Sequence, residues 1–544
     1  MSVEAATSRA GQQYGLTGVG VLVRLFLRRD RLRLPLWMAG FGLFVLYIGT
    51  AIPAIAPNRD ELGSIAGLFT QPVGRMFTGP AYGMDYPSYE RFFASGYAPY
   101  LFIMAALMSI LLVVRHTRDE EQSGRSELIR ANVVGRHTPL TAALVIAAIS
   151  NVFAGVVVTA MSVVVGFAVH GSLIIGVGTA LTGMLFGGCA AVTAQLSEFA
   201  RTASGLAGVA LGASFAMRAL GDMVAVGGSG MSWSSPLGWP AQMAPYVLDR
   251  WSPLGLSAAT TLVMVTLAFV LSRRRDFGAS LLGVRPGPAS AQAFLGSVWG
   301  LASRVQRSTF GGWTAGIVVL GVVDGAFMQA LLDAGDDMPP AFREVLGTAE
   351  LADGYISFLG LFITVLITAF TVSAVSVARN EEVRGRADLV LATPVSRISW
   401  LGSHVVYILF AALVIAVGTG IGTGLSVVAS TGNWAFFGDV VVAHLALLPA
   451  IWFMVGLWTI FMGWLPRLFS PVAWFFVAFT GFVAVFSDML EVPEAASMLS
   501  PVEHLANVPE DEFSALPLVV LLGLTALALT TGFAGMKRRE IATG

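Results

Sequence analysis

The chain contains twelve long runs of mostly apolar residues, and these runs limit its fold more than any other feature of the sequence. An α-helix needs about 20 such residues to cross the hydrocarbon core of a bilayer. A membrane β-barrel would instead show segments of about ten residues with alternating polarity. We therefore predict an all-α membrane protein with about 12 transmembrane helices. They are expected near residues 35–56, 95–114, 140–168, 173–195, 204–225, 253–272, 312–332, 354–376, 400–428, 438–462, 470–488 and 514–535.

The composition agrees with a chain that is embedded in a lipid bilayer. Apolar residues make up 56% of the sequence and charged residues 12%, whereas about a quarter of the residues of a soluble domain are charged. The mean hydropathy is +0.76. This composition excludes a soluble globular domain, and the formal net charge of -1 gives no reason to expect a nucleic-acid partner.

One charged segment between the apolar runs occurs twice, which indicates an internal duplication. Residues 118–136 read RDEEQSGRSELIRANVVGR and residues 379–397 read RNEEVRGRADLVLATPVSR, at a constant offset of 261 residues. Further pairs recur at offsets of 264 to 276 residues, namely Trp37 with Trp313, Ser235-Pro236 with Ser500-Pro501, and the basic clusters 273–275 and 537–539. We predict two tandem, parallel halves of six spanning helices each, formed by residues 1–285 and 286–544.

The distribution of charge predicts the orientation in the membrane. With both termini and both charged segments in the cytosol, 26 of the 32 Lys and Arg residues lie on the cytosolic side. The last loop on the opposite side, residues 491–513, carries six acidic residues and no Lys or Arg. Because positively charged loops stay in the cytoplasm, we expect a multi-pass protein of the cell membrane with both termini cytoplasmic.

A basic amphipathic segment precedes the first apolar run. Arg24, Arg28 and Arg31 share one helical face, while leucine and phenylalanine side chains occupy the others. Such a helix is expected to lie along the cytoplasmic membrane surface. The first span is then expected to begin at Pro35. An ordinary basic flank of that span is the alternative. We predict amphipathic elbow helices over residues 16–34 and 292–310.

The sequence lacks the motifs that would let this chain perform chemistry on its own. Its single lysine, Lys537, is not part of a Gly-Lys-Ser/Thr sequence, which a phosphate-binding loop requires. The six histidines show no spacing typical of a zinc site, and no Gly-x-Ser-x-Gly elbow occurs. We expect no catalytic residue, metal site or cofactor in this chain, although the sequence alone leaves Ser/His/Asp catalysis open.

The order of these elements resembles a known family of transporters. Each half has a basic amphipathic helix, two spans, an E-E-x-x-G-R-x-[E/D]-L segment, three further spans, a Ser-Pro stretch and a last span with a basic end. This order resembles the membrane domain of ABC-2 type exporters, which are also described as type V exporters. Two fused halves resemble the actinobacterial exporter of polyketide antibiotics permeases, the tetronasin-resistance type, over essentially the whole chain.

The resemblance implies the permease subunit of an ATP-driven ABC exporter. Such a subunit moves hydrophobic or amphipathic small molecules, for example antibiotics, drugs or lipids, out of the cell. Two copies of a separate cytosolic ABC ATPase are expected as partners, and these would bind the ATP and Mg²⁺. The identity of the cargo does not follow from the sequence.

The resemblance also implies that residues 115–137 and 377–398 are coupling segments held by the ATPase. Glu120 and Glu127, seven residues apart, are expected on one face of a short helix. A solvated loop with mutually neutralising charges is the alternative, and Asn132-Val133 in place of Thr393-Pro394 leaves open whether both halves couple equally. The predicted coupling residues are Glu120, Glu121, Gly124, Arg125, Glu127, Leu128, Glu381, Glu382, Gly385, Arg386, Asp388 and Leu389.

Charged residues inside membrane spans are costly and often mark a transport path or a contact between helices. Arg218 and Asp222 lie four residues apart in the fifth predicted span and can pair within one helix. With Asp324 and Asp488 they are the candidates for the substrate path. A structural role in contacts between helices is the alternative for each of them.

Two other classes of membrane protein are alternatives. A proton-coupled 12-helix multidrug carrier has an Asp-Arg-x-Gly-Arg signature that superficially resembles residues 119–125, but the Glu-Glu pair and the Ser-Pro stretches argue against it. A membrane glycosyltransferase would use outer carboxylates such as Asp60-Glu61 or Asp336-Asp337. That class usually needs a large outer domain, which the short loops here do not supply.

Overall fold

In the computed structural model, all regular secondary structure of the described residues is helical. These are residues 16–125, 127, 131, 134–276, 278–281, 289–334, 351–486 and 497–539. Eleven of the described helices are long and apolar enough to cross a membrane. This confirms the predicted all-α membrane fold. The remaining predicted span, 470–488, falls on the shorter helix α23, Phe469–Phe486.

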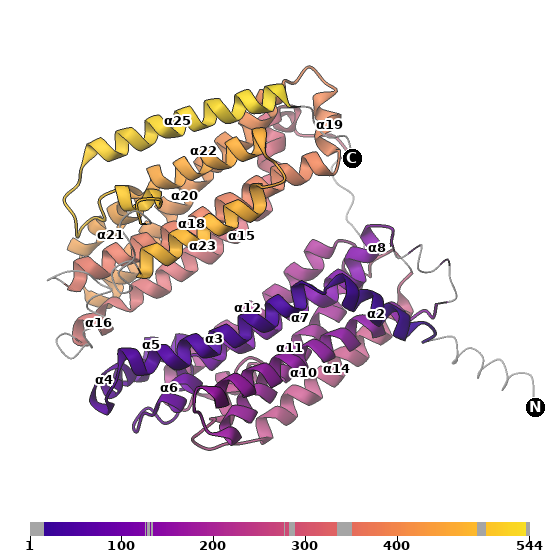
Figure 1. Cartoon of the computed structure of the whole chain (residues 1–544), viewed down its shortest axis with the longest axis vertical. Coiled ribbons are helices and arrows are strands. Elements are labelled where there is room, and N and C mark those ends of the chain that lie inside the picture. The colour runs from indigo at the N-terminus through magenta and orange to yellow at the C-terminus, as the bar shows by residue number, and fades with distance from the viewer. Residues whose placement is uncertain are drawn as a thin grey trace, which may run out of the picture. The chain divides into compact units, whose positions relative to one another are not determined.

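Contacts between residues divide the chain into two compact units, Met1–Pro286 and Gly287–Gly544. Each unit is a bundle of long, roughly antiparallel helices (Figure 1). The predicted boundary between residues 285 and 286 lies outside the described residues. The two units are described separately below and called unit 1 and unit 2.

Unit 1 is built around α11, which packs against α7, α10, α12 and α14. Small residues let these helices approach closely. A Cβ atom on Gly155 of α10 would lie only 2.6 Å from the carbonyl oxygen of Gly176 on α11. The helices of unit 1 are α2 (Val19–Arg29), α3 (Arg33–Ile55), α4 (Arg59–Thr70), α5 (Pro72–Thr78), α6 (Tyr89–Gly96), α7 (Ala98–Val114), a π-helical turn (Arg115–Asp119), α8 (Glu120–Gln122), α10 (Thr138–Val164), α11 (Val169–Leu196), α12 (Ala200–Val224), α13 (Gly230–Ser234), η2 (Ala241–Met243) and α14 (Ser252–Arg274).

Unit 2 repeats this packing with equivalent helices. Helix α20 packs on α15 as α10 packs on α3, and α25 packs on α22 as α14 packs on α11. The helices of unit 2 are η3 (Ala293–Gly296), α15 (Val298–Ala326), α16 (Met328–Ala334), α18 (Leu351–Val383), α19 (Arg386–Leu391), α20 (Arg397–Thr431), α21 (Ala435–Ala446), α22 (Leu448–Trp464), α23 (Phe469–Phe486), η5 (Pro501–His504) and α25 (Ala515–Arg538).

The predicted elbow helix exists as a separate element in unit 1 but not in unit 2. Helix α2 ends at Arg29, and the spanning helix α3 restarts at Arg33 with Pro35 in its first turn, where a missing backbone N–H costs nothing. In unit 2 the single helix α15 runs without a break from Val298 to Ala326. Residues 298–310 of the predicted elbow 292–310 are therefore the first turns of α15, because Gly311 stands at the position of Pro35 and the helix continues.

The fourth span of unit 2 is interrupted, unlike its counterpart α11. Helix α21 ends at Ala446, and α22 begins at Leu448 with Pro449 in its first turn. Proline has no N–H and interrupts the hydrogen-bond ladder of a helix. Such interruptions inside a membrane need neighbouring protein groups to satisfy the backbone.

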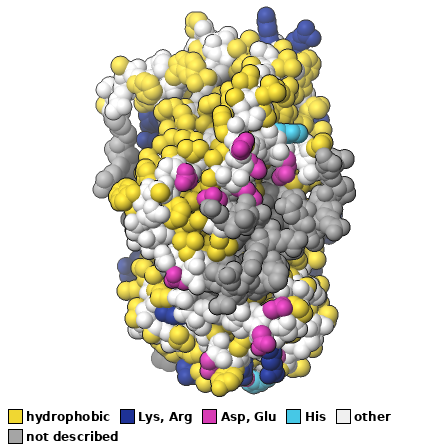
Figure 2. Space-filling model, turned by 90° about the vertical axis from the view of Figure 1, so that its left-hand side faces the viewer, with side chains coloured by type: hydrophobic (Ala, Val, Ile, Leu, Met, Phe, Trp, Pro, Cys, Tyr) yellow, Lys and Arg dark blue, Asp and Glu magenta, His cyan; other side chains and the backbone are white. Residues whose placement is uncertain are grey.

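The Ser-Pro stretches form short helical turns and not further spans. Ser235 is buried, and its hydroxyl donates to the carbonyl oxygen of Ser214 at 2.6 Å. Pro501 begins the single turn η5. These turns lie at the end of each bundle opposite to α8 or α19, which we call the far end (Figure 1). Asp and Glu side chains are visible on the face shown in Figure 2.

Candidate functional site

Both copies of the charged segment fold at the same end of their bundle, which we call the motif end (Figure 1). In unit 1 the segment follows α7 through the π-helical turn and α8, and in unit 2 it follows α18. Gly124 and Gly385 turn the chain with φ angles of 73° and 68°. This left-handed conformation favours glycine, so both copies require glycine at the same place.

The first glutamate of each Glu-Glu pair holds the arginine that lies five residues further on. Arg125 Nε donates to Glu120 Oε2 at 3.2 Å, and Arg386 Nε donates to Glu381 Oε1 at 3.0 Å. The bond to Glu381 raises the pKa of Arg386. Glu120 also pairs with Arg29 of the elbow helix α2. These pairs close the turn around each glycine.

The second glutamate of each pair binds the arginine at the end of the last span of its unit. Arg275 Nη2 lies 2.6 Å from Glu121 Oε1, and Arg539 Nη2 lies 2.7 Å from Glu382 Oε1. The two pairs join residues 154 and 157 positions apart in the sequence. We call them the Glu–Arg staples. Each staple ties the second span of its unit to the sixth.

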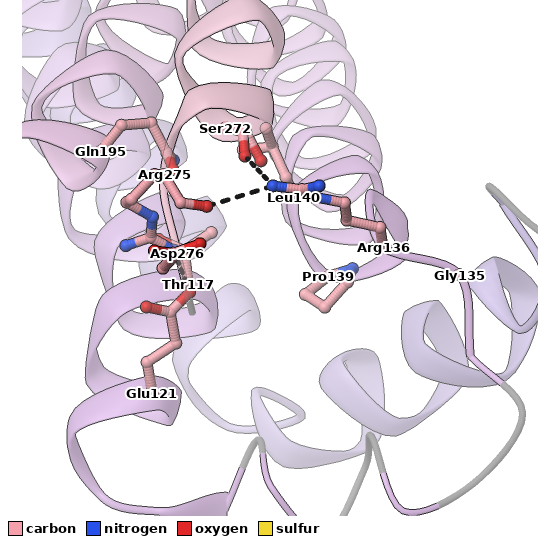
Figure 3. Close-up of a pocket in the computed structure, with 10 residues that line it drawn as sticks. All are labelled: Thr117, Glu121, Gly135, Arg136, Pro139, Leu140, Gln195, Ser272, Arg275 and Asp276. Atoms are coloured by element: carbon pink, nitrogen blue, oxygen red, sulfur yellow. Dashed lines mark hydrogen bonds and ion pairs between the residues drawn. The ribbon is translucent and has the colours of Figure 1, made fainter. Parts of the chain in front are cut away.

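The last arginine of each segment binds backbone carbonyl groups at the end of the same last span. Arg136 Nη2 donates to the carbonyl oxygens of Ser272, Arg273 and Arg275 at 3.0 to 3.3 Å. Arg397 donates to the carbonyl oxygen of Arg539. Figure 3 shows Arg136 reaching the carbonyls of Ser272 and Arg275 in the pocket that Glu121 also lines. The final carbonyls of a helix lack partners in the helix and attract positive charge.

The structure corrects the expected presentation of Glu120 and Glu127. Helix α8 ends at Gln122, and Gly124 then reverses the chain, so the two carboxylates do not share one helical face. Glu120 is only 5% exposed, as is Glu382, because both are held in ion pairs. Leu128 lies outside the described residues.

Among the predicted coupling residues that the structure describes, four are exposed, namely Arg125, Glu127, Arg386 and Leu389. Glu127 is exposed and Asp388 is half-buried. Leu389 of α19 has 76% of its surface exposed. The segments thus combine an internal set of ion pairs with a small outer surface.

Arg218 and Asp222 lie near the far end of unit 1 and are fully buried. Arg218 Nη1 lies 3.2 Å from Asp222 Oδ2, and its Nη2 donates to the carbonyl oxygen of Met76 at 2.7 Å. Asp222 Oδ1 accepts the hydroxyl of Ser232 at 2.6 Å. The pair therefore connects α12 with α5 and α13, which agrees with the structural alternative.

Arg75 strengthens the same contact, although no feature of the sequence around it indicated this role. Its Nε donates to the carbonyl oxygen of Asp222 and its Nη2 to that of Met223, both at 2.7 Å. The two carbonyls belong to the last turn of α12, which ends at Val224. A helix C-terminus attracts cations, so Arg75 anchors the end of this span.

The other two candidates for the substrate path are Asp324 and Asp488, and the structure describes only Asp324. Asp324 lies in α15, where its backbone carbonyl accepts the hydroxyl of Tyr355 at 2.8 Å. Its Oδ2 atom is buried and has no hydrogen-bond partner among the described residues. Asp488 lies outside the described residues.

Two bundles of spanning helices with the same packing and the same charged segment define a multi-pass membrane protein that arose by duplication. The domain described as multidrug efflux system permease Rv1217c, C-terminal domain, matches residues 22–273 and again residues 295–537. The chain is also 35% identical over 538 residues to the multidrug efflux system permease protein Rv1217c of Mycobacterium tuberculosis (strain ATCC 25618 / H37Rv), covering 97% of this chain and 96% of that protein.

The chain therefore belongs to the Rv1217c family of multidrug efflux system permeases. This confirms the prediction of an efflux permease with two repeated halves. A permease is the membrane component of an efflux system, so the chain acts in transport.

Proposed function

We propose that this chain is the permease subunit of an ATP-driven exporter that moves hydrophobic or amphipathic small molecules, drugs among them, out of the cell. The observation that carries the proposal is the match of both halves to a permease domain named for multidrug efflux. Because the chain has no Gly-Lys-Ser/Thr sequence for binding nucleotide phosphates, a separate ABC ATPase supplies the energy. Two copies of this ATPase bind the ATP and Mg²⁺.

The two motif ends are the places where the ATPase subunits bind. Leu389, Asp388 and Glu127 supply accessible apolar and acidic groups there. The buried glutamates have another role in this proposal, because the Glu–Arg staples connect the segment to the last span. A force applied to the segment is then passed to the second and sixth spans together, as rigid-body rocking of a bundle requires.

The motif ends and both termini face the cytosol of a cell in whose plasma membrane the protein lies. Three arginines, Arg273 to Arg275, and the cluster from Lys537 to Arg539 lie at this end of the last spans. Positively charged residues next to spans remain on the cytoplasmic side. The ATPase uses ATP from the cytosol, so it can bind the motif ends only if they face the cytosol.

The proposal is tested by transport in proteoliposomes. The purified chain is reconstituted with or without a co-expressed ABC ATPase, and movement of a hydrophobic fluorescent dye is followed after ATP is added. We expect transport only with both proteins and ATP. Dye movement driven by a pH gradient in liposomes that contain this chain alone would contradict the proposal and favour the proton-coupled carrier.

The contact surface is tested with two matched substitutions of exposed leucines. Leu389→Asp changes the motif end, whereas Leu499→Asp changes a leucine at the far end that is 65% exposed. Burying a leucine side chain in an interface contributes about 1.5–3 kcal/mol, so Leu389→Asp should weaken ATPase binding roughly tenfold or more. Leu499→Asp should bind normally. Equal ATPase co-purification with both variants would remove Leu389 from the interface.

A further inference from the structure

A polar pocket at the motif end of unit 1 lies beside the charged segment, and we call it the Gln195 pocket (Figure 3). Its volume is about 250 Å³. A water molecule takes up about 30 Å³ in the liquid, so the pocket has room for a side chain of a partner protein. The ends of four spans supply its lining, namely Thr117 and Glu121 after the second span, residues within 135–140 at the start of the third, Gln195 at the end of the fourth and residues within 272–276 at the end of the sixth.

The carboxamide of Gln195 has an open hydrogen-bond acceptor. Gln195 is 3% exposed and lies in the last turn of α11, where its Nε2 donates to the carbonyl oxygen of Ala191 at 3.1 Å. Because that carbonyl can only accept, this bond fixes the orientation of the amide. The other polar atom, Oε1, is buried and has no hydrogen-bond partner among the described residues. Since buried polar atoms are normally paired, this atom is suited to a donor group that enters the pocket.

The arginines around the pocket already have partners within unit 1. Glu121 lies 2.6 Å from Arg275 and 2.7 Å from Arg118, through different carboxylate oxygens. Arg136 donates to three carbonyl oxygens at the end of α14. These contacts hold the guanidinium groups in place, and Gln195 Oε1 remains the buried group of the lining that needs a partner.

Unit 2 has large apolar side chains at the equivalent positions. At the offset of 261 residues Trp400 corresponds to Pro139, and at the offset of 264 residues Met536 corresponds to Ser272. Trp400 is 3% exposed and Met536 is 0% exposed. Both belong to the same hydrophobic core cluster. Apolar packing in unit 2 thus replaces part of the polar lining of unit 1.

The counterpart of Gln195 in unit 2 is a glycine. The fourth spans are aligned by Gly188 and Gly456, because a Cβ atom on either glycine would lie 3.0 or 2.9 Å from a Cβ atom of the last span of its unit. The offset between these two glycines is 268 residues, which places Gly463 at the position of Gln195. The repeated bundle therefore forms without a carboxamide at this position.

The pocket lowers the stability of unit 1 while it is empty. A buried acceptor without a partner has lost its hydration, and the atoms around a cavity lose packing contacts. Unit 2 shows that the same arrangement of helices accepts apolar side chains at these positions. Packing of the bundle therefore does not explain the polar pocket, whereas binding of a donor group does.

We propose that the Gln195 pocket receives one side chain of the ATPase, whose hydroxyl, carboxamide or ammonium group donates to Gln195 Oε1. The proposal rests on the proposed function, because it needs an ATPase at the motif end. The ATPase is the occupant because Glu121 and Arg136 of the lining belong to the segment 115–137, where that subunit binds. The inserted side chain contacts the ends of four spans together. Unit 2 binds its ATPase without such an insertion.

The proposal is tested by filling the pocket with the residues of unit 2. The plug variant of the full chain is Pro139→Trp with Ser272→Met. Its control is Pro57→Trp with Ser234→Met, which makes the same exchanges at an exposed proline and an exposed serine of the far end. The ABC ATPase of the transport assay is titrated onto each chain in detergent, and native mass spectrometry counts the ATPase subunits bound.

The unmodified chain and the control should both bind two ATPase subunits. The plug variant should bind one subunit with full affinity and the second roughly tenfold more weakly, because it excludes the inserted side chain and its hydrogen bond. The Tm of the plug variant should not fall, since unit 2 already packs Trp400 and Met536 at the equivalent positions.

A second variant tests the acceptor alone. Gln195→Met keeps the length of the side chain and removes Oε1. Its control, Gln306→Met, removes a buried carboxamide of unit 2 whose Nε2 donates to the carbonyl oxygen of Ala374 at 2.8 Å. Gln195→Met should weaken binding of one ATPase subunit about two- to tenfold, which corresponds to one lost hydrogen bond. The control should bind both subunits with full affinity.

Several results would overturn the proposal and leave the proposed function standing. Two ATPase subunits bound with full affinity by both the plug variant and Gln195→Met would assign the pocket to water. Full ATPase binding together with lost dye transport in the plug variant would assign it to cargo. Equal weakening of both ATPase sites would show that the pocket does not act on one subunit. An unmodified chain that binds no ABC ATPase would instead overturn the proposed function and this inference with it.

Discussion

Replacing Arg218 by Leu should destabilise unit 1, because it leaves the buried carboxylate of Asp222 without its ion-pair partner. Arg218 and Asp222 are both 0% exposed. After the substitution, Asp222 retains the hydroxyl of Ser232 at 2.6 Å. The carbonyl of Met76 loses the donor that reached it at 2.7 Å. Arg75 stays bound to the backbone carbonyl of Asp222 and partly compensates the charge.

These contacts set the size of the expected effect. Removing one partner of a buried ion pair costs about 3–5 kcal/mol, and an unsatisfied buried carbonyl costs about 1–3 kcal/mol. Because Arg75 remains near the carboxylate, we expect a total loss of about 4 kcal/mol. In a domain of 150–250 residues each kcal/mol shifts the melting temperature by about 2–4 °C, so Tm should fall by about 10 °C.

The assay is thermal unfolding of the detergent-solubilised chain, with Arg28→Leu as an exposed control. The double variant Arg218→Leu with Asp222→Leu should recover much of the lost Tm, because replacing both members of a buried pair by apolar residues is often nearly neutral. A single variant that melts like the unchanged chain would refute the structural role. If that variant also altered dye-stimulated ATPase activity, Arg218 would belong to the transport path.

Two further predictions concern the motif ends. Glu121→Gln and Glu382→Gln should each lower Tm by several degrees, because a hydrogen bond to a charged group contributes about 1.5–3 kcal/mol. The control Glu127→Gln changes an exposed glutamate and should leave Tm unchanged. Equal Tm values for all three variants would contradict the Glu–Arg staples. Burial alone would raise the pKa of Asp30, but the hydrogen bond and charge of His116 and the charge of Arg115 together lower it below its ordinary value of 3.8. Its contribution to stability is therefore complete above pH 3.8 and is lost as pH falls through the lowered pKa. Asp30→Asn should flatten this acid limb of a plot of Tm against pH, and an unchanged limb would exclude Asp30 as its source.

The sequence could predict the features that depend on residue type and spacing within a short segment. Continuous apolar runs predicted the spanning helices, because a run of that length has few other stable environments. Equal spacing around Gly124 and Gly385 predicted that both segments fold alike, and both glycines do adopt the left-handed conformation. The helix that ends at Arg29 was predictable from its basic face and from Pro35.

The contacts that give the motif residues their roles join distant parts of the chain and could not be read from a segment. Glu121 and Arg275 are 154 residues apart, and only the fold brings them together. The sequence does contain one relevant signal, because the Glu-Glu pairs and the basic ends recur at nearly the same offset. A contact between them in one half would therefore predict the equivalent contact in the other half. The break before Pro449 had no counterpart in the first half to indicate it.

The central claim of the account is that one chain supplies both membrane halves of an ATP-driven exporter. The most direct test is the mass of the complex that this 57.2 kDa chain forms with its ATPase, measured by native mass spectrometry. The account predicts one copy of this chain with two ATPase subunits. A complex with two copies of this chain, or a chain that transports without any ATPase bound, would contradict it.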